Sequence, residues 1–229
     1  DKTIIVTQDP RQAFVEILRE VTSRKPEWGI HSSVVVHPDA QIHDEVFIGP
    51  NCTIGNVKIG KGSVLHSGIH LYDHVKIGEN VVIEAGVVVG ADGYGFQRDK
   101  DGYWIRFPHL GDVIIEDDVE LCANCTIDRG TLSSTIIGKN SKISKAAHVS
   151  HNCRIGQNCI VAGGAMISGS VTIGDNCWIG PNATLNNKIK VGNNVTIAIG
   201  AVVSKDVAEG FTAVGNRIVP ADMMEQLKK

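Results

Sequence analysis

Aromatic residues are scarce in this sequence: phenylalanine, tryptophan and tyrosine make up 5% of the 229 residues, whereas apolar residues make up 42%. The core must therefore be aliphatic, and the length suits one main domain. A formal charge of −3 leaves no basic excess to neutralise phosphates, so we expect no nucleic-acid partner. The sequence has no apolar run long enough for a membrane span and no signal-like start, which favours a soluble, cytoplasmic protein.

A regular spacing of aliphatic residues is the strongest signal. The longest run has a step of six and comprises Ile137, Ile143, Val149, Ile155, Val161, Ile167, Ile173, Ile179, Leu185, Val191, Ile197 and Val203. Shorter runs extend from Ile30 to Ile54, from Ile59 to Val89 and from Ile115 to Ile127. We call the aliphatic residues of these runs rungs. Four residues after each rung the side chain is small or aliphatic. These hexapeptide repeats predict an all-β solenoid, a left-handed parallel β-helix over residues 29–208.

A second pattern sets the length of one coil. The motif aliphatic-Gly-x-Asn begins at residues 77, 137, 155, 173 and 191, and from 137 onward the starts are eighteen residues apart. Three hexapeptides, one on each of three flat faces, give that spacing. Because Gly and Asn tolerate positive φ, we expect both residues of the motif to form a corner between two faces and to have a structural role only.

The six cysteines fit the same register. All except Cys122 occupy the small inward position four residues after a rung, namely Cys52, Cys125, Cys153, Cys159 and Cys177. We interpret them as free thiols in a reducing compartment, since no spacing matches a zinc site. No metal site is predicted.

The repeat is interrupted once at length, by a loop insertion at residues 90–113. Five of the eleven aromatic residues lie in that stretch. Long loops on a rigid solenoid usually serve recognition, so one interpretation is a flap over a binding cleft. Packing against a neighbouring subunit is the other, and the sequence does not separate the two.

The ends of the chain depart from the repeat. Residues 1–28 contain Asp9-Pro10 followed by apolar residues at helical spacing up to Pro26, which predicts a helix and a linker. Residues 209–229 are predicted as a tail in which Pro220 precedes a short helix from Ala221 to Lys229. We expect these short helices to cap the two open ends of the solenoid.

One pair of residues combines a base with an amide donor. His151 lies two places after the rung Val149, and Gly169 lies eighteen residues further on. One coil therefore brings them within about one strand spacing, roughly 4.8 Å. An imidazole next to a glycine N–H provides a general base beside an oxyanion donor. Most of the other histidines lie off the rungs, and we expect them in solvent or in turns.

Several stretches resemble the UDP-3-O-acylglucosamine N-acyltransferases of lipid A synthesis. They are Ile127-Asp128-Arg129-Gly130, Val149-Ser150-His151-Asn152, Ala162-Gly163-Gly164, Ser168-Gly169-Ser170 and the loop Gly90-Ala91-Asp92-Gly93-Tyr94-Gly95-Phe96. The resemblance implies a homotrimer with sites between subunits and a nucleotide-linked amino sugar as acceptor. It also implies direct attack of the amine on an acyl thioester, with no permanently bound cofactor. His151 would be the base and Gly169 the oxyanion donor. Asn152 or a nearby carboxylate can orient the imidazole, and the sequence does not choose between them.

Further residues are predicted at the two substrates from the same resemblance. Those expected at the sugar are Asp92, Tyr94, Phe96, Asp128, Arg129 and His148. Those expected at the acyl donor are Gly163, Gly164 and Lys188, the last standing where those enzymes carry a second histidine.

The end of the chain resembles a different group, the sugar-nucleotide N-acetyltransferases. The stretches Ile199-Gly200-Ala201 and Val214-Gly215-Asn216-Arg217 are similar to their coenzyme A-binding tail. This predicts acyl-CoA as the donor, with Gly200, Lys205 and Arg217 near the coenzyme. An acyl carrier protein thioester is the alternative, because the body of the chain is similar to carrier-protein-dependent enzymes.

Two interpretations from other classes are weighed against an acyltransferase. A γ-type carbonic anhydrase uses the same β-helix with three zinc-binding histidines, but the spacing of His148 and His151 does not suit that site. A non-catalytic assembly subunit would use the solenoid only to bind partners, and the coincidence of His151 with Gly169 argues against it.

Overall fold

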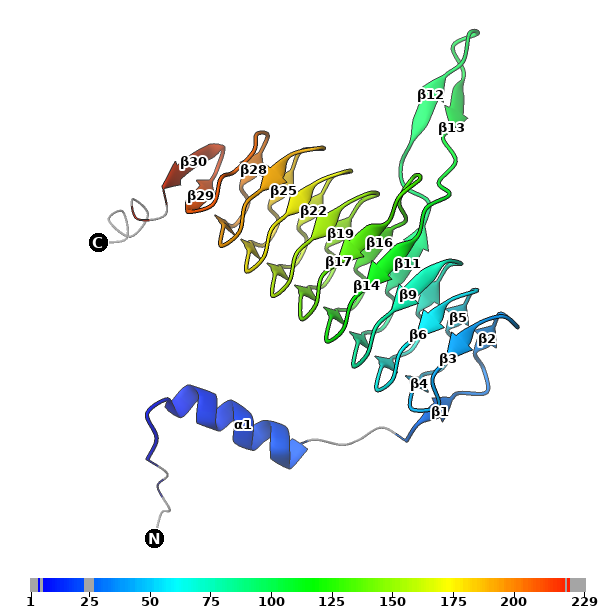
Figure 1. The fold of residues 1–229 in the computed structure, drawn as a ribbon, viewed down its shortest axis with the longest axis vertical. Helices are drawn as coiled ribbons and strands as arrows, with labels where there is room; N and C mark the ends of the chain where they lie inside the picture. The colour runs from blue at the N-terminus through cyan, green and yellow to red at the C-terminus, as the bar shows by residue number, and fades with distance from the viewer. Residues whose placement is uncertain (1–3, 5, 23–26, 221, 223–229) are drawn as a thin grey trace.

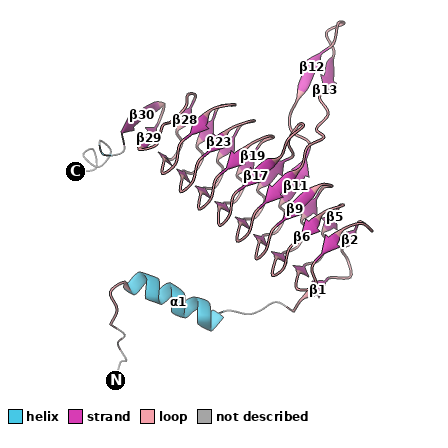
Figure 2. Cartoon of the chain, viewed as in Figure 1, coloured by secondary structure: helices cyan, strands magenta, loops and turns pink. Residues whose placement is uncertain are grey.

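The computed structural model describes residues 4, 6–22, 27–220 and 222, and these form one helix and a parallel β-solenoid (Figure 1). Short strands of successive coils pair in parallel and in register, so the predicted left-handed β-helix is confirmed. Figure 2 shows the regular alternation of short strands and turns along the solenoid.

Three sheets form the faces of the prism. Sheet A consists of β1 (Gly29–Ile30), β4 (Phe47–Ile48), β7 (Val64–Leu65), β10 (Val82–Ile83), β15 (Glu120–Leu121), β18 (Lys142–Ile143), β21 (Ile160–Val161), β24 (Trp178–Ile179), β27 (Thr196–Ile197), β29 (Phe211–Val214) and β30 (Arg217–Pro220). Sheet B consists of β2 (Val35–Val36), β5 (Thr53–Ile54), β8 (His70–Leu71), β11 (Val88–Ala91), β16 (Thr126–Asp128), β19 (His148–Val149), β22 (Met166–Ile167), β25 (Thr184–Leu185) and β28 (Val202–Val203). Sheet C consists of β3 (Gln41–Ile42), β6 (Lys58–Ile59), β9 (Val75–Ile77), β14 (Val113–Ile115), β17 (Thr135–Ile137), β20 (Arg154–Ile155), β23 (Thr172–Ile173) and β26 (Lys190–Val191).

The chain passes from sheet A to B to C in every regular coil, so each coil has three corners. We call the column of corners between sheets A and B the A–B edge, and the column between sheets B and C the B–C edge. The rung residues end the strands and fill the interior, where Leu65, Ile143 and Ile179 have no exposed surface. Five of the six free cysteines are buried with them, as their register predicts, and Cys122 is half-buried.

The Gly-x-Asn corners work differently from the expectation. The asparagines have the left-handed conformation, as at Asn158 with φ 54° and Asn176 with φ 56°. The preceding glycines are needed for another reason: a Cβ on Gly138 would lie 2.6 Å from the backbone of Gly156 in the next coil. Close stacking of coils, and not backbone dihedral freedom, selects glycine at this position.

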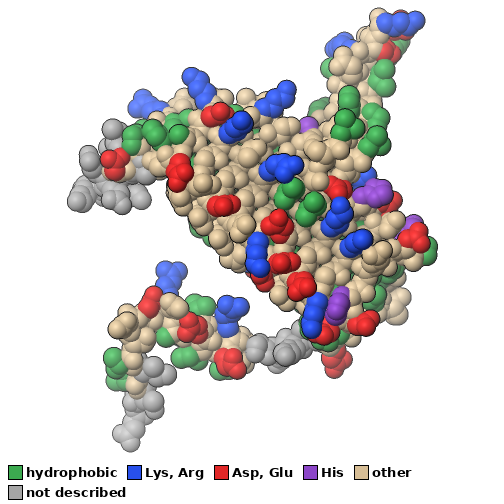
Figure 3. Space-filling model, in the orientation of Figure 1, with side chains coloured by type: hydrophobic (Ala, Val, Ile, Leu, Met, Phe, Trp, Pro, Cys, Tyr) green, Lys and Arg blue, Asp and Glu red, His purple; other side chains and the backbone are tan. Residues whose placement is uncertain are grey.

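The predicted insertion is a two-stranded antiparallel arm. Its strands are β12 (Phe96–Arg98) and β13 (Trp104–Arg106), and it extends away from the solenoid between β11 and β14 (Figure 1). Apolar side chains follow the arm in Figure 3. The rings of Tyr94, Tyr103 and Trp104 are 63–88% exposed.

The N-terminal helix does not form the predicted cap. The helix α1 (Pro10–Thr22) begins as expected, with the Asp9 carboxylate accepting the N–H of Gln12 at 2.9 Å. None of its residues is buried, however, so it covers no end of the solenoid. At the other end β29 continues sheet A and folds back onto β30 as an antiparallel hairpin. Apart from Asp222, the predicted helix of residues 221–229 lies outside the described residues.

Candidate active site

Irregular structure is concentrated on the B–C edge. The arm leaves this edge after β11, and in the next coil the loop 129–134 replaces the short turn between β16 and β17. His151 follows β19 one coil further on, and Gly169 follows β22 in the coil after that. The predicted base and amide donor therefore lie beside the two insertions.

His151 lies directly against Gly169. A Cβ added to Gly169 would be 2.6 Å from His151 Nε2 and 2.7 Å from its Cε1, so only glycine leaves room for the ring. The N–H of Gly169 donates no hydrogen bond to any of the described residues, although the N–H groups of Ser168 and Ser170 both do. The predicted stacking of one coil on the next is confirmed, and this amide is available to a ligand.

Asn152 sets the orientation of the imidazole. Its Oδ1 accepts hydrogen bonds from the backbone N–H of Thr131 at 3.1 Å and from the Thr131 hydroxyl at 2.9 Å, while its Nδ2 donates to Ser133 Oγ at 2.8 Å. The same Oδ1 lies 2.9 Å from His151 Nδ1. An oxygen at this place requires the proton on Nδ1, so Nε2 of the neutral ring carries the lone pair.

A second imidazole, His109, closes the site from the base of the arm. Its ring centroid is 5.3 Å from that of His151, and the residue is 5% exposed. Gly93 fits between the two rings, since a Cβ there would approach both within 2.9 Å. Burial lowers the pKa of His109, and the neighbouring His151 lowers it further, despite the hydrogen bond from its Nδ1–H to the Phe107 carbonyl. His109 was not predicted as a site residue, since most histidines other than His151 were expected in solvent or in turns. Only the fold of the arm brings His109 to His151.

His148 and Asp128 form a half-buried pair next to the base. Nε2 of His148 lies 3.5 Å from Asp128 Oδ2, and its Nδ1 lies 2.7 Å from the Thr126 hydroxyl. Burial lowers the pKa of His148 and raises the pKa of Asp128 to about 7, so burial opposes charge on both partners. A carboxyl that titrates near neutrality beside a candidate base is a common feature of active sites.

The other residues predicted at the sugar fall into two groups. Arg129 donates to the carbonyls of Gly90 at 2.7 Å and Asp73 at 2.6 Å, so its guanidinium fastens the base of the arm. Asp92 lies between Arg106 and Arg129, at 3.5 Å and 3.9 Å.

The predicted aromatic contacts lie on the arm itself. The rings of Tyr94 and Phe96 meet edge to face, with centroids 5.1 Å apart. They remain 88% and 39% exposed, and the ring that packs against His151 is that of His109.

The residues predicted at the acyl donor do not come together within one chain. Lys188 and Lys205 follow β25 and β28 and lie on the B–C edge, in the coils beyond Gly169. Gly163, Gly164 and Gly200 follow strands of sheet A and lie on the A–B edge.

Arg217 belongs to the terminal hairpin. It is in β30 and lines a pocket of about 270 Å³ together with Lys205.

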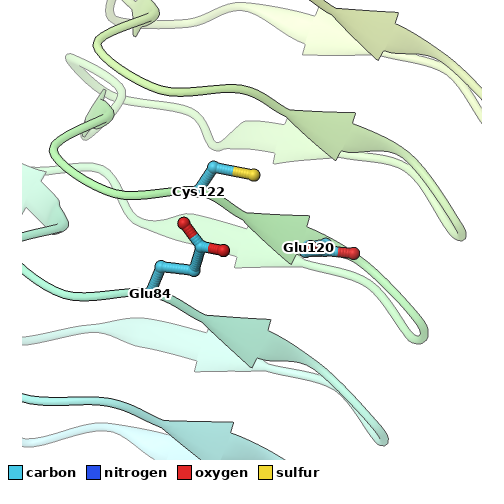
Figure 4. Close-up of side chains that lie close together, drawn as sticks. All are labelled: Glu84, Glu120 and Cys122. Atoms are coloured by element: carbon cyan, nitrogen blue, oxygen red, sulfur yellow. The ribbon is translucent and has the colours of Figure 1, made fainter.

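One group of side chains has the composition of a metal site. Glu84, Glu120 and Cys122 place ligand atoms within 4.8 Å of one another, and Figure 4 shows them on neighbouring coils. They lie at sheet A and the A–B edge, away from His151. One Glu84 oxygen already accepts the Ala123 N–H at 2.9 Å, and burial raises the pKa of the Cys122 thiol, which disfavours the thiolate that a metal needs.

The chain matches two protein-family models. One is described as bacterial transferase hexapeptide (six repeats) and matches residues 56–91, 134–169 and 170–205. The other is described as hexapeptide repeat of succinyl-transferase and matches residues 112–144. Together they cover most of the solenoid.

Proteins named UDP-3-O-acylglucosamine N-acyltransferase are similar in sequence. The one from Coxiella burnetii (strain Dugway 5J108-111) is 38% identical, over 66% of this chain and 50% of the relative. The one from Polynucleobacter asymbioticus is 34% identical, with the same shares of both chains. The chain thus spans about half the length of the curated relatives it matches.

Solved structures of UDP-N-acetylglucosamine acyltransferases are similar in fold. The enzyme from Campylobacter jejuni superposes with a TM-score of 0.75 at 27% identity, covering 83% of this chain and 73% of that one. The enzyme from Francisella novicida gives 0.71 at 28% identity, covering 87% and 73%. In the described part of the chain, no helix is long and apolar enough to cross a membrane.

Proposed function

Because this chain belongs to the bacterial hexapeptide transferases, we propose that it transfers an acyl group from a thioester to the amine of a nucleotide-linked amino sugar. The observation that carries the proposal is the contact of His151 with Gly169, with Asn152 holding the imidazole. The names of the similar proteins, which act on UDP-linked glucosamine derivatives, agree with this class of acceptor.

The reaction proceeds by direct attack. Nε2 of neutral His151 accepts a proton from the neutral sugar amine while the nitrogen lone pair forms a bond to the thioester carbonyl carbon. The carbonyl oxygen then carries negative charge. When the tetrahedral intermediate collapses, the C–S bond breaks, and the imidazolium returns its proton to the leaving thiolate. The products are an amide and a thiol, and no bond to the enzyme forms.

Gly169 and Asn152 stabilise two different charges that develop during the reaction. The unpaired N–H of Gly169 is an oxyanion donor that needs no reorganisation, and donors of this kind contribute about 3–4 kcal/mol to transition-state stabilisation. The Asn152 oxygen accepts the Nδ1–H and stabilises the imidazolium that forms during the proton transfer. Both residues lie on the B–C edge.

A homotrimer would complete the site. The predicted acyl-donor residues occupy two different edges of the prism, so one donor molecule meets both groups only if two subunits contribute them. The A–B edge of one subunit would then face the B–C edge of its neighbour, and three-fold closure leaves no edge unmatched. The exposed apolar arm would be covered in such an assembly. Light scattering should give about three times 24.5 kDa, and an active monomer would contradict the assembly.

We further propose acyl-CoA as the donor. Lys205 and Arg217 line one pocket and would meet the coenzyme phosphates through charge-assisted hydrogen bonds. The small residues near Gly200 leave room for a pantetheine arm. The acyl carrier protein thioester is the alternative donor, and turnover with the carrier protein but with no coenzyme A thioester would select it.

The test is an acyl-transfer assay on the purified protein. Short-chain and 3-hydroxyacyl thioesters of coenzyme A and of acyl carrier protein are offered with UDP- or dTDP-linked amino sugars, and the amide product is followed by mass spectrometry. We expect turnover with one thioester class, and a turnover about 10²–10⁴-fold lower after His151→Ala. A binding-only assembly subunit would give no product with any pair, and that result would reject the proposed function. We also propose that the protein acts in the cytoplasm.

A further inference from the structure

One hollow beside the B–C edge has no role in the reaction described above. It is a pocket of about 470 Å³, within the usual range of small-ligand sites, formed by the N-terminal halves of sheet C strands and by the loop 129–134. Its lining includes Ser133, which accepts a hydrogen bond from Asn152. The pocket is therefore connected to His151 through two hydrogen bonds.

Cationic and imidazole side chains line one wall of this pocket. Lys58 and Lys76 are paired positions on β6 and β9, and His74 precedes β9. Lys58 and the His74 imidazole have no partner among the described residues. Lys76 is held by Asp112 at 2.8 Å, and this carboxylate keeps a pKa below its usual value, although its burial acts in the opposite direction.

The charges of this wall leave a positive excess. Two lysines and one carboxylate give +1 with His74 neutral. An anion is the complementary ligand.

Residues with unpaired backbone donors complete the lining of the pocket. Along the loop 129–134, the N–H groups of Leu132, Ser133 and Ser134 donate no hydrogen bond to the described part of the chain, and all three residues line the pocket. Consecutive unpaired N–H groups form concave sites for phosphate oxygens. The Ser133 hydroxyl proton is a further available donor, because its oxygen already accepts the Asn152 amide.

We propose that this pocket binds the diphosphate group of a substrate, with Lys58 and the N–H groups of residues 132–134 as its ligands. The inference deepens the proposed function and rests on it, since a nucleotide-linked sugar and coenzyme A both carry a diphosphate. Its position next to Ser133 brings such a substrate beside Asn152 and His151. The diphosphate that the pocket would bind is chemically the same in the nucleotide-linked sugar and in coenzyme A.

The first experiment measures binding of inorganic pyrophosphate, UDP-N-acetylglucosamine and coenzyme A to the full chain by titration calorimetry at low ionic strength. Lys58→Gln should weaken the diphosphate ligand of this pocket about tenfold, the loss of one charge-assisted contact, and Lys58→Glu should weaken it more. Lys190→Gln is the matched control, because Lys190 occupies the same register column of sheet C as Lys58, several coils away. We expect the control to bind within twofold of the wild type.

The second experiment observes the loop directly. Pyrophosphate should shift the backbone amide NMR signals of Leu132, Ser133 and Ser134, and these shifts should be lost in Lys58→Glu. If the affinity is the same in Lys58→Gln, Lys58→Glu and wild type, and the three amides do not move, the site is rejected.

The choice of ligands distinguishes an acceptor site from a donor site. It also distinguishes failure of the diphosphate site from failure of the proposed function. A Lys58 effect on UDP-N-acetylglucosamine assigns the pocket to the acceptor, and an effect on coenzyme A assigns it to the donor; either result supports a diphosphate site. Pyrophosphate binding that depends on Lys58, together with no acyl transfer to any sugar, would reject the proposed function alone. Acyl transfer that depends on His151, with no Lys58 effect on any ligand, would reject the pocket alone.

Discussion

The C-to-A corners and the B–C edge of the same prism are built from the same repeat, yet the proposed site lies on only one of them. At the C-to-A corners, Asn140, Asn158 and Asn176 repeat one tight turn in successive coils. Along the B–C edge the turn is replaced by an arm, then by the loop 129–134, and then by a turn that carries His151. Tight stacking at the regular corners brings backbone against backbone, as at Gly138 and Gly156, whereas the insertions add side chains and unpaired amides next to a rigid backbone. The comparison indicates that the regular coils form a rigid frame and that the irregular edge carries the proposed site.

The largest expected effect separates equivalent positions on the two edges. His151 and Gln157 both lie two residues after a rung, the first on the B–C edge and the second at a C-to-A corner. We expect His151→Ala to lower turnover by about 10²–10⁴-fold, the contribution of a general base, while the oligomer stays folded. Gln157→Ala should keep turnover within twofold. Steady-state kinetics and light scattering measure both; near-wild-type turnover of His151→Ala would refute the role of the base.

Alanine substitution of a glycine on the B–C edge and of a glycine at a C-to-A corner should have opposite effects on activity and stability. In Gly169→Ala the new Cβ would meet the His151 ring, a side chain that can move, so we expect turnover to fall by about 10²-fold with little loss of stability. In Gly138→Ala the Cβ would meet the backbone of Gly156 at 2.6 Å, so the loss should be of stability and not of activity. Thermal unfolding and kinetics of the two variants check this. Equal losses of stability would contradict the comparison.

Two left-handed asparagines test the orientation of the imidazole. Asn152 has φ 61° and Asn158 has φ 54°, and each alanine variant should lose about 1–2 kcal/mol of stability from the backbone alone. Only Asn152→Ala also removes the oxygen that accepts His151 Nδ1–H, so we expect its turnover to fall by about 10–100-fold. Asn158→Ala should keep its turnover at a temperature where both variants are folded. If Asn152→Ala is as active as Asn158→Ala, Asn152 does not position the base.

The smallest effect concerns pH and the buried carboxyl of Asp128 on sheet B. Burial raises the pKa of Asp128 to about 7, above its usual value of 3.8, so the folded chain binds this proton more tightly than the unfolded chain. Stability from this group is therefore fully present below pH 3.8 and is lost as the pH rises to about 7. Asp128→Asn should raise the unfolding temperature at pH 8 by about 2–6 °C, and the gain should vanish near pH 4.

The exposed Asp118 at a corner provides the control for this pH experiment. Asp118→Asn should show no pH-dependent gain of this kind, because that carboxylate is paired with Lys139 in solvent. Calorimetric scans across pH measure both variants. A gain for Asp128→Asn that is equal at pH 4 and pH 8 would exclude burial of the charge as its cause.

Much of the fold could be predicted from the sequence because the β-helix repeats one local rule. Every rung from Ile137 to Val203 is an inward strand residue, and the phase change between Ile54 and Ile59 appears as a shorter corner between β5 and β6. The capping roles of the two ends were wrong or lie outside the described residues. Apolar spacing indicates a helix such as α1, but it contains no information about the surface on which that helix packs.

The candidate site also has one part that could be predicted from the sequence and another that could not. A period of eighteen residues determined that His151 lies on Gly169, because residues one coil apart in a solenoid are neighbours by construction. The position of His109 against His151, the acceptance of Nδ1–H by Asn152 and the unpaired amides of the loop 129–134 were decided by the tertiary structure alone. These depend on the paths of two insertions that follow no repeat, and a path without periodicity is fixed only by the contacts it makes when folded.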